Sequence, residues 1–60
     1  ILDIESMITL QNLLKSQGYD VGKVDGILGA KTRQAVRLVQ LAFGLSADSW
    51  PTNDLLRKLQ

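Results

Sequence analysis

The sequence predicts an all-α fold: a small orthogonal bundle of three helices, with a structured glycine-rich loop between the first two. Two segments place apolar residues at helical spacing, a third short one follows a proline, and three glycines interrupt residues 19–29. The chain has 60 residues, which is fewer than half of a typical domain. We therefore expect a single domain over residues 1–60.

The first helix is expected at about residues 4–17. Apolar residues share one of its faces or lie at the edges of that face: Met7, Leu10 and Leu14, with Leu13 and Ile4 at the edges. Asp3 or Ser6 is suited to cap the start of this helix. Gly18 is the left-handed residue expected just past its end.

Residues 18–29 are expected to form a compact loop. Glycine loses more backbone entropy on ordering than other residues, so the glycines here oppose a helix. Apolar side chains of the loop are expected to close the base of the core: Val21, Val24, Ile27 and Leu28. The pair Asp25-Gly26 is typical of a tight turn with positive φ at the glycine, and we expect Asp25 to fix that turn.

The second helix is expected at about residues 30–43, ending before Gly44. Val36, Val39 and Phe43 share its apolar face, while Leu38 and Leu41 lie on the opposite side. A helix that is apolar nearly all round belongs in the middle of its domain. Alternatively, the two leucines face another protein surface.

The third helix is expected at about residues 53–59, with Thr52 as its N-cap. Leu55, Leu56 and Leu59 form its short apolar stripe. A weak internal echo joins the first two helices, since each contains an apolar-Gln pair, Leu10-Gln11 or Val39-Gln40, and is then followed by a glycine. Two residues are too few to establish a repeat.

Composition excludes several classes of function. The chain has no Cys and no His. Disulfide scaffolds, zinc fingers, thiol nucleophiles and imidazole acid–base chemistry are therefore excluded. The loop carboxylates do not follow the calcium-binding pattern, because Gly22 and Val24 stand where oxygen ligands are needed. We expect no catalytic residue, no metal site and no cofactor, so the chain by itself is not expected to be an enzyme.

The charge is balanced overall and uneven along the chain. The net charge is +1; residues 1–30 carry two basic and four acidic groups, and residues 31–60 five basic and two acidic. This balance argues against a nucleic-acid partner. Lys31, Arg33, Gln34 and Arg37 suit a DNA-reading helix, yet about twelve residues separate the first two helices where a helix-turn-helix has three or four. No apolar run approaches the ~18 residues of a membrane span.

A set of small motifs spans nearly the whole chain. They are Leu10-Gln11, Gly18-Tyr19-Asp20, Gly22, the block from Val24-Asp25-Gly26 to Gly29 and Thr32, Val36, Val39-Gln40 and Gly44-Leu45. In this order the sequence resembles the peptidoglycan-binding domain family of bacterial cell-wall modules, over about residues 7–59. Four positions depart from the usual pattern: Leu28 and Val39 replace Phe, Ala30 replaces a frequent Pro, and Ser49 replaces a Gly after Asp48.

The resemblance implies a three-helix, non-catalytic module that binds peptidoglycan (murein), through its glycan or its stem peptide. Such a module targets an attached lytic enzyme, most closely a lytic transglycosylase, to its substrate. The implied partners are peptidoglycan and the catalytic domain of the parent chain, and the implied location is the bacterial cell envelope, in the periplasm. Because the chain begins at Ile1, we expect it to be a piece of a longer protein.

The candidate ligand-binding residues combine cations, backbone amides and aromatic rings: Tyr19, Gly29, Lys31, Thr32, Arg33, Arg37 and Trp50. On this hypothesis the three cations form a ledge that engages stem-peptide carboxylates, with arginine binding in bidentate fashion. Amides near Gly29 and Thr32 face outward at a helix N-terminus. The two rings supply apolar walls. For Trp50, burial in the core is the more common alternative.

A second function from another class also fits the sequence. Leu38 and Leu41 are expected on the outer side of the second helix. An exposed leucine pair is suited to dock a catalytic domain, which makes the chain an interdomain module without a ligand of its own.

Overall fold

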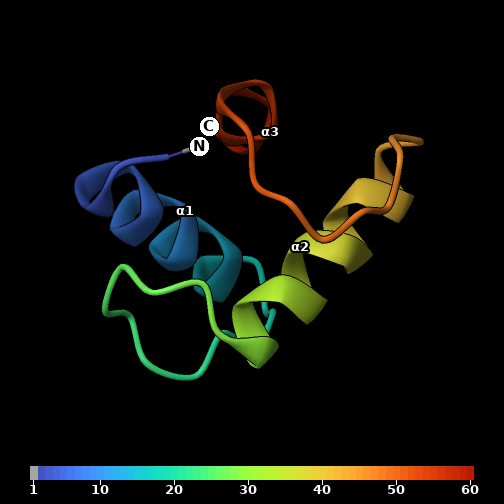
Figure 1. Ribbon diagram of the computed structural model, residues 1–60. Helices are drawn as coiled ribbons and strands as arrows, with labels where there is room; N and C mark the ends of the chain where they lie inside the picture. The colour runs from blue at the N-terminus through green and yellow to red at the C-terminus, as the bar shows by residue number, and fades with distance from the viewer. Residues whose placement is uncertain (1) are drawn as a thin grey trace.

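The computed structural model describes residues 2–60, whose regular secondary structure consists of three helices: α1 (Ile4–Ser16), α2 (Ala30–Ala42) and α3 (Asn53–Leu59). α1 and α2 run across the view in Figure 1, whereas α3 is seen end-on above them. The predicted all-α fold with three helices is confirmed. The ranges predicted for the first two helices each extend one residue too far. Within residues 2–60, no helix is both long and apolar enough to cross a membrane.

Local signals in the sequence set the helix boundaries. Asp3 caps α1 by accepting a hydrogen bond from Ser6 N at 2.8 Å, and Thr52 caps α3 by accepting one from Leu55 N at 3.1 Å. After α1, Gly18 turns left-handed at φ 93°, and Gly44 does the same after α2 at φ 72°. The helix starts and the glycine ends agree with the sequence prediction.

One apolar core joins the three helices and the loop. Its buried members come from every part of the chain: Leu2, Met7, Leu10, Leu14, Val21, Ala35, Val36, Val39, Leu55 and Leu59. Leu13, Tyr19, Val24, Leu28 and Leu56 pack partly buried against it. The glycine-rich loop therefore contributes to the core as predicted at residues 21, 24 and 28.

Two predicted core residues lie at the surface. Ile27 is 66% exposed, because its backbone belongs to a turn that directs the side chain away from the core. Phe43 is also exposed, because α2 ends at Ala42 and its C-terminal end extends beyond α1 and α3 (Figure 1). Helical spacing alone placed Phe43 on the buried face, but the core does not reach that far along the helix.

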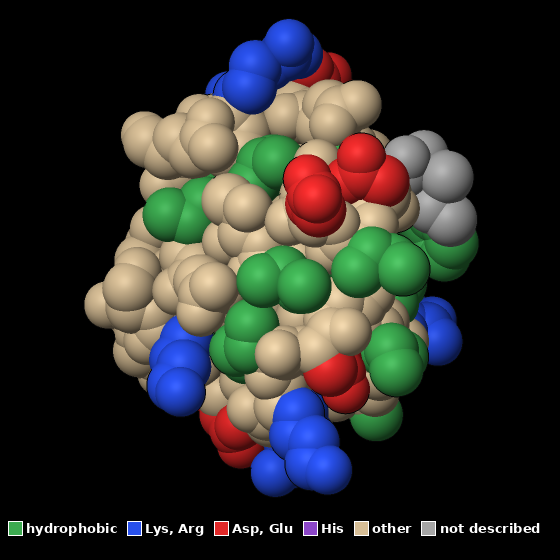
Figure 2. All heavy atoms as spheres, turned by 90° about the vertical axis from the view of Figure 1, so that its left-hand side faces the viewer, with side chains coloured by type: hydrophobic (Ala, Val, Ile, Leu, Met, Phe, Trp, Pro, Cys, Tyr) green, Lys and Arg blue, Asp and Glu red, His purple; other side chains and the backbone are tan. Residues whose placement is uncertain are grey.

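Further apolar side chains are exposed on two faces. Leu38 and Leu41 lie on the outer side of α2, 47% and 56% exposed, as the sequence predicts. Ile4 and Ile27 are exposed beside Gly26, on the face formed by α1 and the loop. Figure 2 shows that face, where apolar side chains are spread among charged ones of both signs.

Candidate functional site

A buried glutamine holds the turn at residues 25–27. Gln11 is 0% exposed; its Oε1 accepts hydrogen bonds from the backbone N–H groups of Asp25 (3.1 Å) and Gly26 (2.8 Å). Its Nε2 donates to Ile27 O (3.0 Å) and to Thr32 Oγ1 (3.1 Å). Asp25 Oδ1 accepts from Ile27 N at 2.9 Å, so Asp25 fixes this turn as predicted.

A second buried glutamine holds the turn at residues 48–50. Gln40 Oε1 accepts from Ser49 N at 3.0 Å, and Nε2 donates to Asp48 Oδ1 (3.0 Å) and Trp50 O (3.1 Å). Asp48 Oδ1 also accepts from Trp50 N at 2.9 Å. These bonds fix the backbone of Ser49 and Trp50 and the side chain of Asp48.

The two glutamine-held turns (residues 25–27 and 48–50) are built in the same way. In each, an aspartate accepts from the amide two residues on, the middle residue has positive φ (Gly26 79°, Ser49 63°), and a glutamine contacts both its N–H and the next C=O. Each turn is followed by an N-cap, Gly29 or Thr52, four residues after the aspartate. The echo of two apolar-Gln pairs in the sequence is therefore a structural repeat.

The first turn borders a groove beside the start of α2, which we call the Lys31 groove. It has a volume of about 280 Å³ and is lined by Val21, Gly22, Lys23, Asp25, Ile27, Gly29, Ala30, Lys31 and Thr32. Two lysines and one aspartate give it a net positive charge. The groove thus combines cations with the exposed side chain of Ile27.

A smaller hollow of about 250 Å³ lies on the other side of Lys31, between Tyr19, Gln34 and Leu38. Lys31 Nζ lies 3.5 Å from Asp20 Oδ2 there, in an exposed ion pair. The pKa of Asp20 is lowered chiefly by the hydrogen bond from Gly22 N, and further by the charge of Lys31. Asp20 therefore remains ionised and offsets part of the charge of Lys31.

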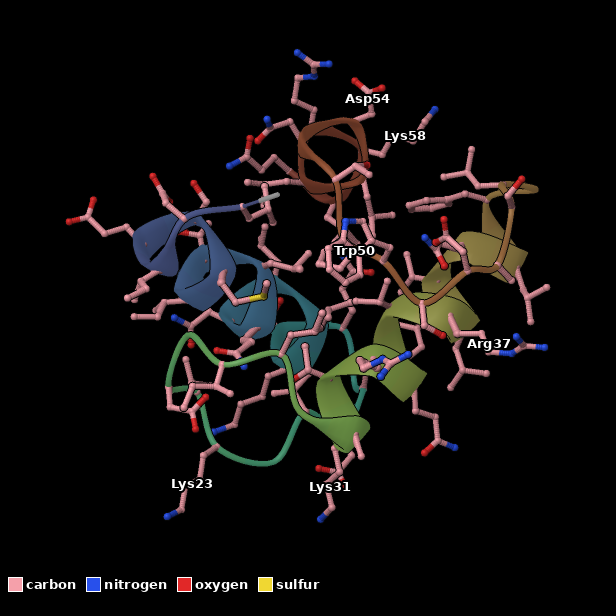
Figure 3. The ribbon with its side chains drawn as sticks, viewed as in Figure 1. Lys23, Lys31, Arg37, Trp50, Asp54 and Lys58 are labelled. Carbon is pink, nitrogen blue, oxygen red and sulfur yellow. The ribbon has the colours of Figure 1, made fainter. Side chains whose placement is uncertain are left out.

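The second turn borders a larger groove, which we call the Trp50 groove. Its volume is about 520 Å³ and it is lined by Gln40, Leu45, Ser46, Asp48, Trp50, Thr52, Asp54, Arg57 and Lys58. Trp50 is 44% exposed, so the alternative that placed it in the core is wrong. Pro51 is buried in its place. Figure 3 shows Trp50 between Lys31 at one end of the molecule and Lys58 at the other.

Several charged side chains that line the Trp50 groove are bonded to other residues of the chain. Arg57 forms an ion pair with Asp54, one turn earlier in α3. The pKa of Asp48 is held below its ordinary value of 3.8, first by the amide of Trp50 and then by the side chain of Gln40. In the part of the chain that the structure describes, Lys58 forms no ion pair. The groove thus presents an aromatic ring, an ionised carboxylate and a lysine.

The predicted site residues do not form one ledge. Lys31 and Arg33 are two positions apart on α2, about 200° around the helix, so they lie on opposite flanks. Arg37 shares the flank of Arg33, and its Nη1 donates to Ala47 O at 3.1 Å. Gly29 and Thr32 line the same groove as Lys31, whereas Trp50 lines the other groove.

Two predicted residues are engaged inside the fold. Thr32 is 1% exposed, and its Oγ1 accepts from Gln11 and donates to Val21 O at 3.2 Å. The N–H of Gly29 donates to Ile27 O at 3.0 Å. The hydroxyl of Thr32 and the N–H of Gly29 are therefore bonded to residues of the loop that contains the turn at residues 25–27. Across residues 2–60, no three acidic side chains gather in a way that suits a metal ion.

Comparison with known proteins identifies relatives over nearly the whole chain. A family model described as "Putative peptidoglycan binding domain" matches residues 4–59. A spore cortex-lytic enzyme of Bacillus cereus is 48% identical over 44 residues, which cover 73% of this chain and 17% of that enzyme.

Solved structures also contain a segment similar to this chain in sequence and fold. SltB3 from Pseudomonas aeruginosa, crystallised with NAG-anhNAM-pentapeptide, matches 98% of this chain with a TM-score of 0.94 and 47% identity. Its structure with NAG-NAM-pentapeptide matches the full chain with a TM-score of 0.95. The chain spans only 16% of SltB3 in each case.

Proposed function

Because this chain belongs to the peptidoglycan-binding domain family, we propose that it is a non-catalytic module that binds murein and holds an attached lytic enzyme, a lytic transglycosylase, against the wall. One observation carries this proposal: a spore cortex-lytic enzyme, and SltB3 in complex with a murein fragment, each contain a segment 47–48% identical to this chain as a small part of their length. A tether raises the local concentration of enzyme at its substrate, so even weak binding is useful.

The side chains support binding without catalysis. With neither Cys nor His in the chain, acid–base chemistry would depend on carboxyl groups. A catalytic carboxylic acid needs a raised pKa to hold its proton near neutral pH. Asp3, Asp20 and Asp48 have lowered pKa values, each from hydrogen bonds donated by nearby groups. These three groups are suited to accept hydrogen bonds from a ligand and poorly suited to protonate one.

We assign the Lys31 groove as the primary contact with wall fragments. Lys23 and Lys31 offer ammonium groups to the free carboxylates of stem peptides, and Ile27 offers apolar contact. Arg33 and Arg37 extend the positive surface along the other flank of α2. Tyr19 lines the hollow next to Lys31 and supplies an apolar wall.

Retention on insoluble sacculi tests the binding function. The purified chain is expected to sediment with sacculi, and Lys23→Gln with Lys31→Gln is expected to reduce retention. Lys15→Gln on the last turn of α1 is the matched control. Retention no greater than that of an unrelated protein of similar size and charge contradicts wall binding. Amide shifts on titration with soluble muropeptides map the contact, and a response that omits residues 22–32 contradicts the groove.

We propose the bacterial cell envelope as the location, and the periplasm within it, because a module that binds the wall acts where the wall is. A translational fusion of the longer protein to a reporter that is active only outside the cytoplasm is expected to be active. An inactive, stably expressed fusion contradicts this location.

One observation favours a second function. Leu38 and Leu41 are about half exposed on the outer side of α2, and this leucine pair is suited to dock the attached catalytic domain. Leu38→Ser with Leu41→Ser is then expected to increase protease sensitivity between the two domains and to leave sacculus retention unchanged. Unchanged protease sensitivity contradicts docking.

A further inference from the structure

We propose that the Trp50 groove is a second ligand subsite, separate from the Lys31 groove, which binds a sugar ring bearing a carboxylate-containing substituent. This inference rests on the proposed function, because such a fragment belongs to murein. The sugar ring stacks on Trp50, the carboxylate pairs with Lys58, and a sugar hydroxyl donates to Asp48.

The turn at residues 48–50 fixes the backbone of Trp50, although it requires an unfavourable backbone conformation at Ser49. Ser49 has φ 63°, a left-handed conformation that is unfavourable for a residue with a side chain. Gln40 and Asp48 hold this turn, and the backbone of Trp50 is bonded at both its N–H and its C=O. An indole ring on a fixed backbone is pre-organised for stacking.

The charged side chains that line the groove favour a sugar substituent that carries a carboxylate. The ion pair between Arg57 and Asp54 neutralises both partners, so among the basic residues that line this groove Lys58 is the one without an ion-pair partner in residues 2–60. Lys58 is exposed, so its ammonium group is accessible to a carboxylate. Asp48 Oδ1 accepts from Trp50 and Gln40, while Oδ2 accepts no hydrogen bond from the described residues and is available to a hydroxyl group.

The internal repeat supplies an independent argument for two subsites. The two grooves begin at equivalent turns: Asp25 corresponds to Asp48 and Ile27 to Trp50. The Lys31 groove continues along the first residues of α2, and the Trp50 groove continues along α3 as far as its last turn. Each groove therefore combines an exposed apolar side chain, an aspartate and at least one lysine. A polymer with repeating units is able to occupy both, which raises its overall affinity through effective concentration.

The single Trp of the chain makes the test specific to this groove, because intrinsic tryptophan emission reports on Trp50 alone. We expect a soluble disaccharide-peptide fragment of murein to change the emission saturably. Lys58→Gln is expected to raise the Kd for this fragment by about tenfold, through loss of a charge-assisted hydrogen bond. Lys15→Gln is the matched control and is expected to leave the Kd unchanged.

Ligand variants separate the two contacts. A disaccharide that carries no carboxylate, such as one made only of N-acetylglucosamine, is expected to change the emission of Trp50 equally in the native chain and in Lys58→Gln. The free peptide without sugar is expected to leave the emission unchanged.

The outcomes distinguish this inference from the proposed function. If the fragment shifts amides of the Lys31 groove and leaves Trp50 emission and its neighbours unchanged, the second subsite is wrong and wall binding stands. If the fragment and sacculi both fail to bind, both proposals are wrong. If Lys58→Gln binds the fragment as tightly as the native chain, the assignment of the carboxylate is wrong.

Discussion

The backbone of Gly26 lies against the side chain of Ile4: a Cβ placed at residue 26 would lie 2.8 Å from Ile4 Cγ2 and 3.4 Å from Ile8 Cγ1. Gly26 also has φ 79°. The contact and the dihedral angle both require glycine here, and they join the first glutamine-held turn to α1.

Gly26→Ala is expected to lower the free energy of unfolding by about 2–3 kcal/mol, from the left-handed backbone and the crowding of Ile4 together. Urea unfolding followed by circular dichroism measures this change. Gly29→Ala is the matched control, because a Cβ there meets open space and φ is −89°; its effect is expected to stay below about 1 kcal/mol. Adding Ile4→Ala to Gly26→Ala is expected to recover only the part of the lost unfolding free energy that comes from crowding against Ile4. Equal effects at residues 26 and 29 contradict the prediction.

Gln11→Ala is expected to destabilise the chain by about 2–4 kcal/mol, because it removes the partner of three part-buried backbone groups of the turn at residues 25–27 and breaks the buried hydrogen bond to Thr32. For a domain of this size, a loss of that order removes most of the stability. Thermal unfolding measures the effect. Asn12→Ala, an exposed neighbour on α1, is the control and is expected to change stability by less than about 0.5 kcal/mol. A Gln11→Ala chain as stable as the native one shows that the glutamine does not hold the turn.

Gln40→Ala is expected to raise the pKa of Asp48 toward its ordinary value of 3.8, since the amide of Gln40 is one of the two main donors that lower it. The pKa is not expected to return fully, because the Trp50 amide is the larger cause. Carboxyl carbon chemical shifts across a pH titration measure this change. Gln34→Ala, on the exposed side of α2, is expected to leave the pKa of Asp48 unaltered.

Stability is expected to fall in acid. Asp3, Asp20 and Asp48 have folded-state pKa values below 3.8, so their contribution is present above that pH and is lost as pH falls through the folded pKa values. Unfolding midpoints in urea measured from about pH 5 downward test this. Asp48→Asn keeps an acceptor oxygen in the turn and removes one titrating group, so its midpoint is expected to decline less steeply. An identical decline in the variant excludes Asp48 as a contributor.

Ser49→Gly is expected to raise the free energy of unfolding by up to about 1 kcal/mol. Glycine removes the cost of positive φ, and the gain is reduced by its greater freedom in the unfolded state. Ser49→Val is expected to do the opposite, because a β-branched residue is poorly suited to φ 63°. The melting temperatures of the native chain, Ser49→Gly and Ser49→Val are expected to rank Ser49→Gly highest and Ser49→Val lowest.

The helices were predictable because their signals are local. Asp3 and Thr52 cap helices, Gly18 and Gly44 follow helix ends, and apolar spacing identifies the buried faces of α1 and α2. The roles of Gln11 and Gln40 were missed, since a method based on apolar spacing assigns a glutamine to the surface. The paired apolar-Gln sequence was the one signal of their burial, and two residues carry little weight until the bonds of each side chain are seen.

The candidate site was harder to predict, because it depends on contacts between distant residues. Lys31 and Arg33 are close in sequence and lie on opposite flanks of α2. Trp50 is exposed because the turn at residues 48–50 directs its ring outward while Pro51 fills the core. The separation of Lys31 and Arg33 follows from their spacing once α2 is known, whereas the exposure of Trp50 follows from neither residue type nor spacing.

In both turns a buried glutamine positions the backbone, so the segment between the glutamine and the aspartate does not have to do so. Gln11 and Asp25 are 14 residues apart and Gln40 and Asp48 only 8, yet both pairs form the same turn. The length of the segment before each aspartate is therefore not set by the turn that follows. Insertions near Lys23 would enlarge the loop and leave the Asp25 turn undisturbed, so related chains are free to diversify there while keeping a common frame.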